Sequence, residues 1–176
     1  MKKLTAILLT IILALAVTVV FSEAASTIYY YMPYMQSNAA GVTYCIVSNM
    51  SSETLNTTFT VGSNTTGVTT GTANSLSTIA TNTTKQMTFY QQAVTFGSTT
   101  ATIASDVPDA NSTSYAGTLT FTATSEFGTT GTKATCLSVV MACFQGTTNP
   151  KRNLIGYACK DNGTDGPGGN NNVIGY

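Results

Sequence analysis

The sequence contains no histidine and few charged side chains, and both absences restrict its chemistry. Without histidine there is no Ser-His-Asp triad, no Cys-His pair and no Cys-x-x-Cys-His haem attachment. Charged residues make up 8% of the chain, whereas they supply roughly a quarter of an average protein. We therefore expect a protein that is not an enzyme and that holds no cofactor.

The charge balance argues against nucleic acid as a partner. After residue 24 the chain has five Lys and Arg and six Asp and Glu, so its net charge is close to minus one. Binding to phosphates needs a basic surface, which this composition does not supply. Asp106 and Asp109 could form an acid/base couple of the glycosidase kind. We interpret them instead as turn residues on either side of Pro108.

Residues 1–24 are predicted to form a signal peptide of the Sec type, removed by cleavage before Ala25. Lys2 and Lys3 supply the positive start, the run after them is uncharged to residue 21, and small residues precede the cleavage point. The alternative is an uncleaved anchor, because the apolar run approaches the roughly 18 residues that span a bilayer. We expect a secreted or cell-surface protein that crosses the periplasm and meets the membrane only through this leader.

Threonine indicates the fold class, because it alternates with apolar residues in several segments. In residues 115–122 apolar side chains occupy one face of an extended chain and threonines the other. The same alternation recurs in residues 55–61 and 87–90. We predict an all-β, Ig-like antiparallel β-sandwich of about 7–8 strands, preceded by the signal-peptide helix. This domain is predicted to span residues 25–160.

Turn residues divide the domain into its predicted strands. The strands are expected at residues 28–35, 42–49, 55–61, 85–96, 99–104, 115–124, 134–144 and 154–160. Residues 62–84 could form a long loop or two short edge strands. Residues 161–176 are rich in Gly and Asn, and we expect them to form a flexible tail.

Export makes the cysteines disulfide candidates. They are Cys45, Cys136, Cys143 and Cys159. Strand parity places Cys143 on the core face and Cys136 on the other. If the last two strands form a hairpin about Thr147, Cys136 lies opposite Cys159, and Cys45 bridges to Cys143 across the sandwich. This pairing ranks first. A longer turn would pair Cys143 or Cys45 with Cys159 instead.

Residues 161–166 resemble a calcium-binding loop. Asp161 and Asp165 occupy its first and fifth positions, and a glycine occupies the sixth. The match is incomplete, because Gly163 stands where a ligand is needed and Asn172 replaces the closing glutamate. We interpret the segment as a linker and keep Asp161 and Asp165 as a weak calcium candidate.

The first segment after the leader contains Tyr29, Tyr30, Tyr31 and Tyr34. The simplest interpretation is an edge strand that ends at Pro33, with Tyr29 and Tyr31 on one face. Alternatively, an exposed tyrosine platform could stack on sugar rings. In a third interpretation, the segment leaves its own domain and adds a strand to the sheet of a neighbouring copy.

Three segments together resemble a group of secreted bacterial β-sandwich domains. They are Tyr29–Tyr34, Gly41–Asn49 and Cys136–Gly146. Such domains open with an aromatic-x-Pro-aromatic strand, continue into a strand that ends in Asn, and have a late strand that ends in Phe-x-Gly. The resemblance implies a fold and an extracellular location, and no particular activity. Fimbrial subunits of the chaperone and usher pathway are a weaker likeness, since the Asn-rich tail lacks their alternating final strand.

These observations predict a structural or adhesive protein of the cell surface, whose most specific form is a pilus-like filament subunit that exchanges strands. The alternative is an extracellular module that binds carbohydrate or another ligand. The expected partners are copies of the same chain, other cell-surface proteins or carbohydrate.

Overall fold

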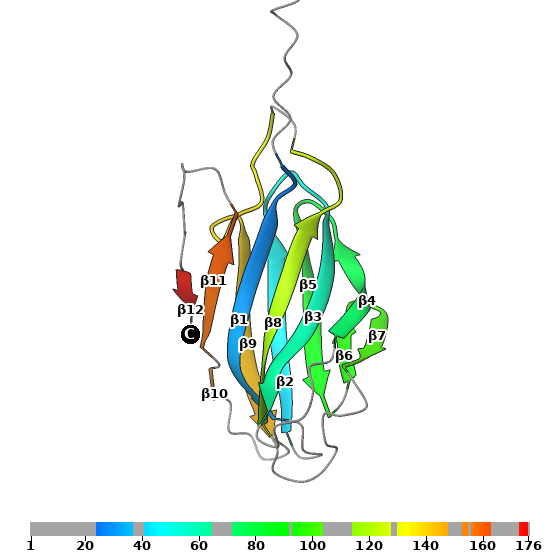
Figure 1. Cartoon of the computed structure of the whole chain (residues 1–176), viewed down its shortest axis with the longest axis vertical. Helices are drawn as coiled ribbons and strands as arrows, with labels where there is room; N and C mark the ends of the chain where they lie inside the picture. The colour runs from blue at the N-terminus through cyan, green and yellow to red at the C-terminus, as the bar shows by residue number, and fades with distance from the viewer. Residues whose placement is uncertain are drawn as a thin grey trace, which may run out of the picture.

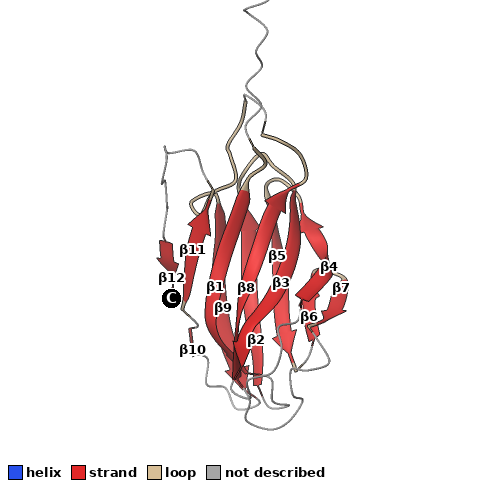
Figure 2. Ribbon diagram, in the orientation of Figure 1, coloured by secondary structure: helices blue, strands red, loops and turns tan. Residues whose placement is uncertain are grey.

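The computed structural model of the chain describes residues 24–36, 41–64, 72–91, 93–103, 114–127, 130–147, 153–154, 156–162 and 173–175. In these ranges all regular structure is strand, and the strands form two antiparallel sheets that pack face to face (Figures 1 and 2). The chain is therefore an all-β sandwich, as predicted. Residues 1–23, which include most of the predicted signal-peptide helix, lie outside the described ranges.

Sheet 1 has the strand order β12-β11-β1-β8-β3-β4. Its strands are β12 (Val173–Gly175), β11 (Tyr157–Asp161), β1 (Thr27–Gln36), β8 (Ser114–Ala123), β3 (Leu55–Asn64) and β4 (Thr72–Ile79). Sheet 2 has the order β10-β9-β2-β5-β6-β7. Its strands are β10 (Asn153–Leu154), β9 (Val139–Thr147), β2 (Gly41–Asn49), β5 (Thr83–Tyr90), β6 (Ala93–Phe96) and β7 (Thr99–Thr102).

The centre of the sandwich pairs its strands as an immunoglobulin domain does, and its flanks do not. β2 pairs with β5 and β3 pairs with β8, like strands B with E and C with F of that fold. However, the strand beside β8 is β1, where an immunoglobulin domain has its last strand. The strand beside β2 is β9, where that fold has its first strand. The first strand of the described ranges therefore lies inside a sheet, between β8 and β11.

Threonine alternation predicted correctly which face is buried in residues 55–61, 87–90 and 115–122. Leu119 and Phe121 are fully buried, while the threonines between and beside them are partly exposed. The buried aromatic rings join the sheets. Phe59 of sheet 1 meets Phe89 of sheet 2 edge to face, with 4.8 Å between ring centroids. Such pairs contribute about 0.5–1.5 kcal/mol beyond the burial of their area.

Several predicted boundaries are wrong. Residues 85–96 form two strands, because Gln91 turns the chain with a φ of 51° between β5 and β6. Residues 154–160 divide between β10 and β11, which belong to different sheets. β4 occupies part of the undecided stretch 62–84. The predicted flexible tail includes Asp161, the last residue of β11, which pairs with Ile28 of β1. It also includes all of β12, which pairs with Tyr157–Cys159 of β11. No described segment forms a helix that is long and apolar enough to cross a membrane.

The disulfides have the pairing that ranked first. However, the bridge predicted to cross the sandwich lies within one sheet, and the bridge predicted within a hairpin joins the two sheets. Cys45 and Cys143 face each other on neighbouring strands of sheet 2, with 4.0 Å between Cα atoms. They do not cross the sandwich. Cys136, just before β9, instead reaches Cys159 in sheet 1. The predicted hairpin about Thr147 is short, because the chain makes only the two-residue β10 before it crosses to sheet 1.

Candidate ligand-binding face

The tyrosine-rich segment forms β1, which is an internal strand. It pairs with β8 on one side and with β11 on the other, so the prediction of an edge strand is wrong. It also continues beyond Pro33 to Gln36, with a bulge between Met32 and Met35. The bulge accommodates one extra residue in β1, which lets the strand pass a proline without ending.

Tyr30 points into the core and takes no part in an exposed platform. Its side chain is 1% exposed, and its hydroxyl donates a hydrogen bond to the backbone oxygen of Val139. Burial raises the pKa of Tyr30 far above its ordinary value, and the neighbouring Tyr157 and Asp161 raise it further. Tyr30 thus links the two sheets, and the expectation that it belongs to an exposed ligand platform is wrong. Its place at an interface formed by strand exchange stays a prediction.

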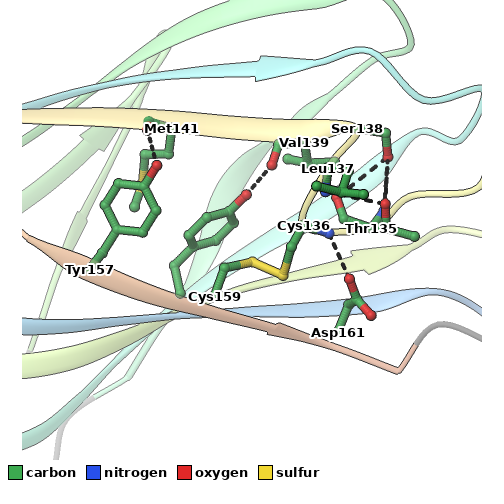
Figure 3. Close-up of a disulfide and its surroundings, with 10 residues drawn as sticks. Thr135, Cys136, Leu137, Ser138, Val139, Met141, Tyr157, Cys159 and Asp161 are labelled. Atoms are coloured by element: carbon green, nitrogen blue, oxygen red, sulfur yellow. Dashed lines mark hydrogen bonds between the residues drawn. A yellow bond between two sulfur atoms is a disulfide. The ribbon is translucent and has the colours of Figure 1, made fainter. Parts of the chain in front are cut away.

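A cluster of contacts around the Cys136–Cys159 disulfide holds β11 to the strand opposite (Figure 3). The Tyr157 hydroxyl donates to the backbone oxygen of Met141. Asp161 is buried, and its Oδ2 atom accepts a hydrogen bond of 2.7 Å from the Cys136 backbone nitrogen. These bonds pair the polar groups that the contact between the sheets buries.

The weak calcium candidate is not assembled by the described residues. The Asp161 carboxylate accepts a backbone hydrogen bond inside the domain, and Asp165 lies outside the described ranges. Among the residues that the structure describes, no three His, Cys, Asp or Glu side chains come together as a metal site would require.

Tyr29 and Tyr31 lie on the outer face of sheet 1. Their rings are nearly parallel, with an interplanar angle of 19° and 6.4 Å between centroids. Tyr31 is 44% exposed. Thr118 lies beside Tyr31 on β8, and Thr120 lies beside Tyr29. Threonine hydroxyls therefore border the tyrosine pair. The backbone of Tyr34 belongs to β1, while its side chain lies outside the described part of the structure.

An open groove of about 440 Å³ adjoins Tyr31. Pro33 and Thr118 line it from β1 and β8, and Gly156 and Tyr157 line it from the start of β11. Its lining is almost entirely apolar, and none of the described residues along it carries a charge. The groove therefore suits an uncharged ligand.

The groove exists because β11 pairs with only part of β1. The backbone groups of Thr27 face this side, since its nitrogen donates to the Asn162 side chain and its oxygen accepts from the Asn162 backbone nitrogen. The backbone groups of every second residue of a strand point to the same neighbour, so those of Tyr29, Tyr31 and Pro33 also point toward β11. The last register pair between the two strands is Tyr31 with Ala158. Pro33 is next in the series and has no N–H to donate. Pairing stops there, and the edge of β1 is left open beside the groove.

Comparisons with known proteins found no matching family model, curated protein or solved structure. Function must therefore be argued from the geometry of this face. We call the outer face of sheet 1 around Tyr29, Tyr31, Thr118 and the groove the tyrosine face.

The sequence correctly predicted that Tyr29 and Tyr31 lie on the same face of the strand. It did not predict the groove. Pro33 was the available signal, because a proline inside a continuing strand leaves one edge without a donor. Small residues were a second signal. Gly62 lines the groove on β3, and a Cβ there would have only the Ala116 backbone oxygen within 4 Å, at 3.9 Å, so a larger side chain would occupy the groove.

Proposed function

We propose that the chain is a secreted or cell-surface adhesive protein without catalytic activity, and that its tyrosine face binds an uncharged sugar ring. One observation carries the proposal. The exposed Tyr31, whose ring is nearly parallel to that of the partly exposed Tyr29, borders an uncharged groove of about 440 Å³. This volume falls within the range of roughly 300–1,000 Å³ that is common for ligand pockets.

The chemistry of a sugar fits this mixture of groups. The C–H face of a pyranose ring packs on an aromatic ring, as other apolar groups do. Its hydroxyls need hydrogen-bonding partners, and the hydroxyls of Thr118 and Thr120 lie beside the tyrosines. An open groove with few polar groups favours weak binding to a single sugar. Adhesion would then depend on several copies that bind together, which multiplies weak affinities.

An extracellular location is supported by the cysteines and by the start of the domain. All four cysteines are paired, and disulfides persist chiefly in oxidising compartments. Of the described residues at this end, Ala24 is exposed, while the Ala25 backbone oxygen accepts a hydrogen bond from the Asn162 side chain. Ala25 is the residue before which cleavage of the leader is predicted.

A glycan array probed with residues 25–176 tests the proposal. We expect binding to neutral glycans that is lost in Tyr31→Ala and weakened in Tyr29→Ala. The matched control is Tyr44→Ala, since Tyr44 is 40% exposed on the outer face of sheet 2. Binding that survives Tyr31→Ala, or that is lost equally in Tyr44→Ala, would contradict the proposal. Circular dichroism of each variant verifies that the fold is retained.

A filament subunit is the second candidate, and the covalent structure favours it. β1 follows the predicted cleavage site, and neither disulfide includes it, because both join residues of β2, β9, β11 and the segment before β9. β1 can therefore leave its slot without breaking a covalent bond and occupy the same slot of another copy. Electron microscopy of the purified chain should then reveal fibres.

A disulfide lock distinguishes exchange of β1 from other kinds of assembly. Thr27 and Thr122 are register partners on β1 and β8, so Thr27→Cys/Thr122→Cys would hold β1 in its own domain. We expect fibres to be absent from the oxidised variant and to return on reduction with a mild thiol. The single variant Thr27→Cys is the control. Fibres that form from the oxidised double variant would exclude this route, and a chain that stays monomeric under all conditions would exclude the filament.

A further inference from the structure

Glu53 is a buried carboxylate with one oxygen paired and the other unpaired. Its side chain is 8% exposed. Its Oε2 atom accepts hydrogen bonds from the Ser26 hydroxyl at 2.7 Å and from the Ala134 backbone nitrogen at 2.6 Å. Its Oε1 atom is buried and has no hydrogen-bond partner. An unpaired buried oxygen of a carboxylate is costly, so this position calls for one more donor.

The surrounding loop fixes Glu53 firmly. The Asn49 side-chain amide donates to the Glu53 backbone oxygen at 2.7 Å, and the Glu53 backbone nitrogen donates to the Ser51 hydroxyl at 3.2 Å. The same hydroxyl donates to the Asn49 side-chain oxygen at 2.6 Å. Because Glu53 is held from both ends of its backbone, the missing donor must come to the carboxylate.

The start of the domain lies against this carboxylate. Ser26 is fully buried, and its hydroxyl contacts Glu53 directly. Ala25 packs against the core, and the Asn162 side chain binds both the Ala25 backbone oxygen and the Thr27 backbone nitrogen. The Ala25 nitrogen is thus one residue from a group that touches Glu53, and consecutive Cα atoms are only about 3.8 Å apart.

We propose that Glu53 binds the α-ammonium group that removal of the leader creates on Ala25. Hydrolysis of the Ala24–Ala25 peptide bond consumes one water. Its hydroxyl goes to the Ala24 carbonyl, and the Ala25 nitrogen gains the remaining hydrogen together with the proton that the new Ala24 carboxylic acid releases as it ionises. An uncharged amide with one N–H thereby becomes a cation with three donors. The Glu53 Oε1 atom accepts one of them, and the ion pair fixes the first residue of the processed chain.

The inference depends on cleavage before Ala25 and is independent of any ligand at the tyrosine face. Its consequence is that the domain is less stable before processing than after it. Only a chain that begins at Ala25 places the ammonium group correctly. A chain that begins at Ala24 moves the charge one residue away and restores an amide at Ala25.

A double-mutant cycle on stability tests the pair. Residues 25–176 are released from a fusion so that Ala25 carries a free amine, and half of the sample is acetylated at that amine. We expect acetylation to raise the unfolding equilibrium constant at least tenfold, about 1.4 kcal/mol, as measured by urea denaturation. In Glu53→Gln, acetylation should change this constant less than twofold. Glu126→Gln, at an exposed glutamate, is the matched control and should behave like the parent chain.

Two further measurements keep the test decisive if Glu53→Gln does not fold. The rate of reductive methylation of the α-amine should be at least tenfold slower in the folded chain than in urea. A chain extended by Ala24 should lose the added stability. An amine that reacts equally fast in both states, or acetylation that has no effect on the parent chain, overturns the proposal. In that case a water molecule satisfies Glu53 Oε1.

Discussion

Cys136 and Cys159 join the two sheets, because Cys136 immediately precedes β9 of sheet 2 and Cys159 lies in β11 of sheet 1. Their Cα atoms are 5.9 Å apart. The other disulfide joins direct neighbours within sheet 2. One bridge therefore holds the layers together, and the other reinforces a single layer.

Removal of each disulfide should destabilise the fold to a different extent. The chain-entropy model predicts a loss of about 4.7 kcal/mol for Cys45→Ser/Cys143→Ser and about 3.4 kcal/mol for Cys136→Ser/Cys159→Ser. The difference follows from sequence separations of 98 and 23 residues. Urea denaturation of both variants measures the losses. A larger loss for the shorter loop would mean that the contact between the sheets outweighs chain entropy.

Stability should fall in alkaline solution. Burial raises the pKa of Tyr30 and of Tyr115 well above the ordinary value of 10.0. Above that pH the unfolded chain loses these protons while the folded chain keeps them, so the free energy of unfolding decreases as pH rises. Each residue contributes a slope of up to about 1.4 kcal/mol per pH unit. At a pH below the pKa of these tyrosines in the unfolded chain, both states keep the protons, and the free energy of unfolding has its full value.

Denaturation between pH about 8 and about 11 measures this slope. Tyr30→Phe removes one titrating group. The free energy of unfolding of this variant should therefore fall less steeply with pH, by up to about 1.4 kcal/mol per pH unit. The variant should also be less stable at neutral pH by about 1–3 kcal/mol, because the backbone oxygen of Val139 loses its donor. Tyr31→Phe serves as the control at an exposed position. Equal slopes in the parent chain and Tyr30→Phe would contradict a contribution of Tyr30 to the loss of stability in alkali.

A methyl group at Gly117 should disrupt the core beneath the groove. A Cβ atom there would lie 2.2 Å from Cζ of Phe59 and 2.9 Å from the backbone oxygen of Thr60. We expect Gly117→Ala to cost about 1–3 kcal/mol or more, because the Phe59 ring must move. Gly62→Ala is the control, since its nearest atom is 3.9 Å away. Thermal denaturation compares the two, and equal melting temperatures would refute the expected clash.

Replacement of Pro33 should make the open edge of β1 competent for pairing. Pro33→Thr restores an N–H where pairing with β11 stops. We expect faster aggregation on storage, detected by light scattering, with little change in monomer stability. Thr118→Val changes the same groove without adding a backbone donor and is the matched control. If Pro33→Thr stays as soluble as the parent chain, the proline does not protect this edge.

The burial pattern of the strands could be predicted from the sequence because alternation is a local property. The threonines beside Leu119 and Phe121 mark the exposed face of the strand, so the two apolar side chains are predicted to point into the core. The pattern failed before β9, where parity predicted an outward Cys136 and the residue is 4% exposed. Residues 135–139 form a turn there, in which the Val139 nitrogen donates to the Thr135 oxygen, and a turn interrupts the two-residue period.

The neighbours of each strand could not be predicted, since strand pairing depends on the path of the whole chain. Local sequence gives no sign that β1 lies between β8 and β11, or that the chain crosses between sheets after β10. The candidate site was only partly predictable for the same reason, since it is formed by several neighbouring strands. Tyr31 was identifiable, whereas the groove beside it requires Gly156 to come opposite Pro33 across more than a hundred residues.

The bridge between Cys136 and Cys159 also determines how the domain bears tension. A pull on the chain beyond β12 would peel that short strand from β11, and then Lys160 and Asp161, which follow Cys159, from β1. At Cys159 the force passes through a covalent bond to the segment before β9, and from β9 through Cys143 to Cys45. Mechanical extension from that end therefore stops at the bridge, and only the part of the chain between Cys143 and Cys159 stays shielded from the load.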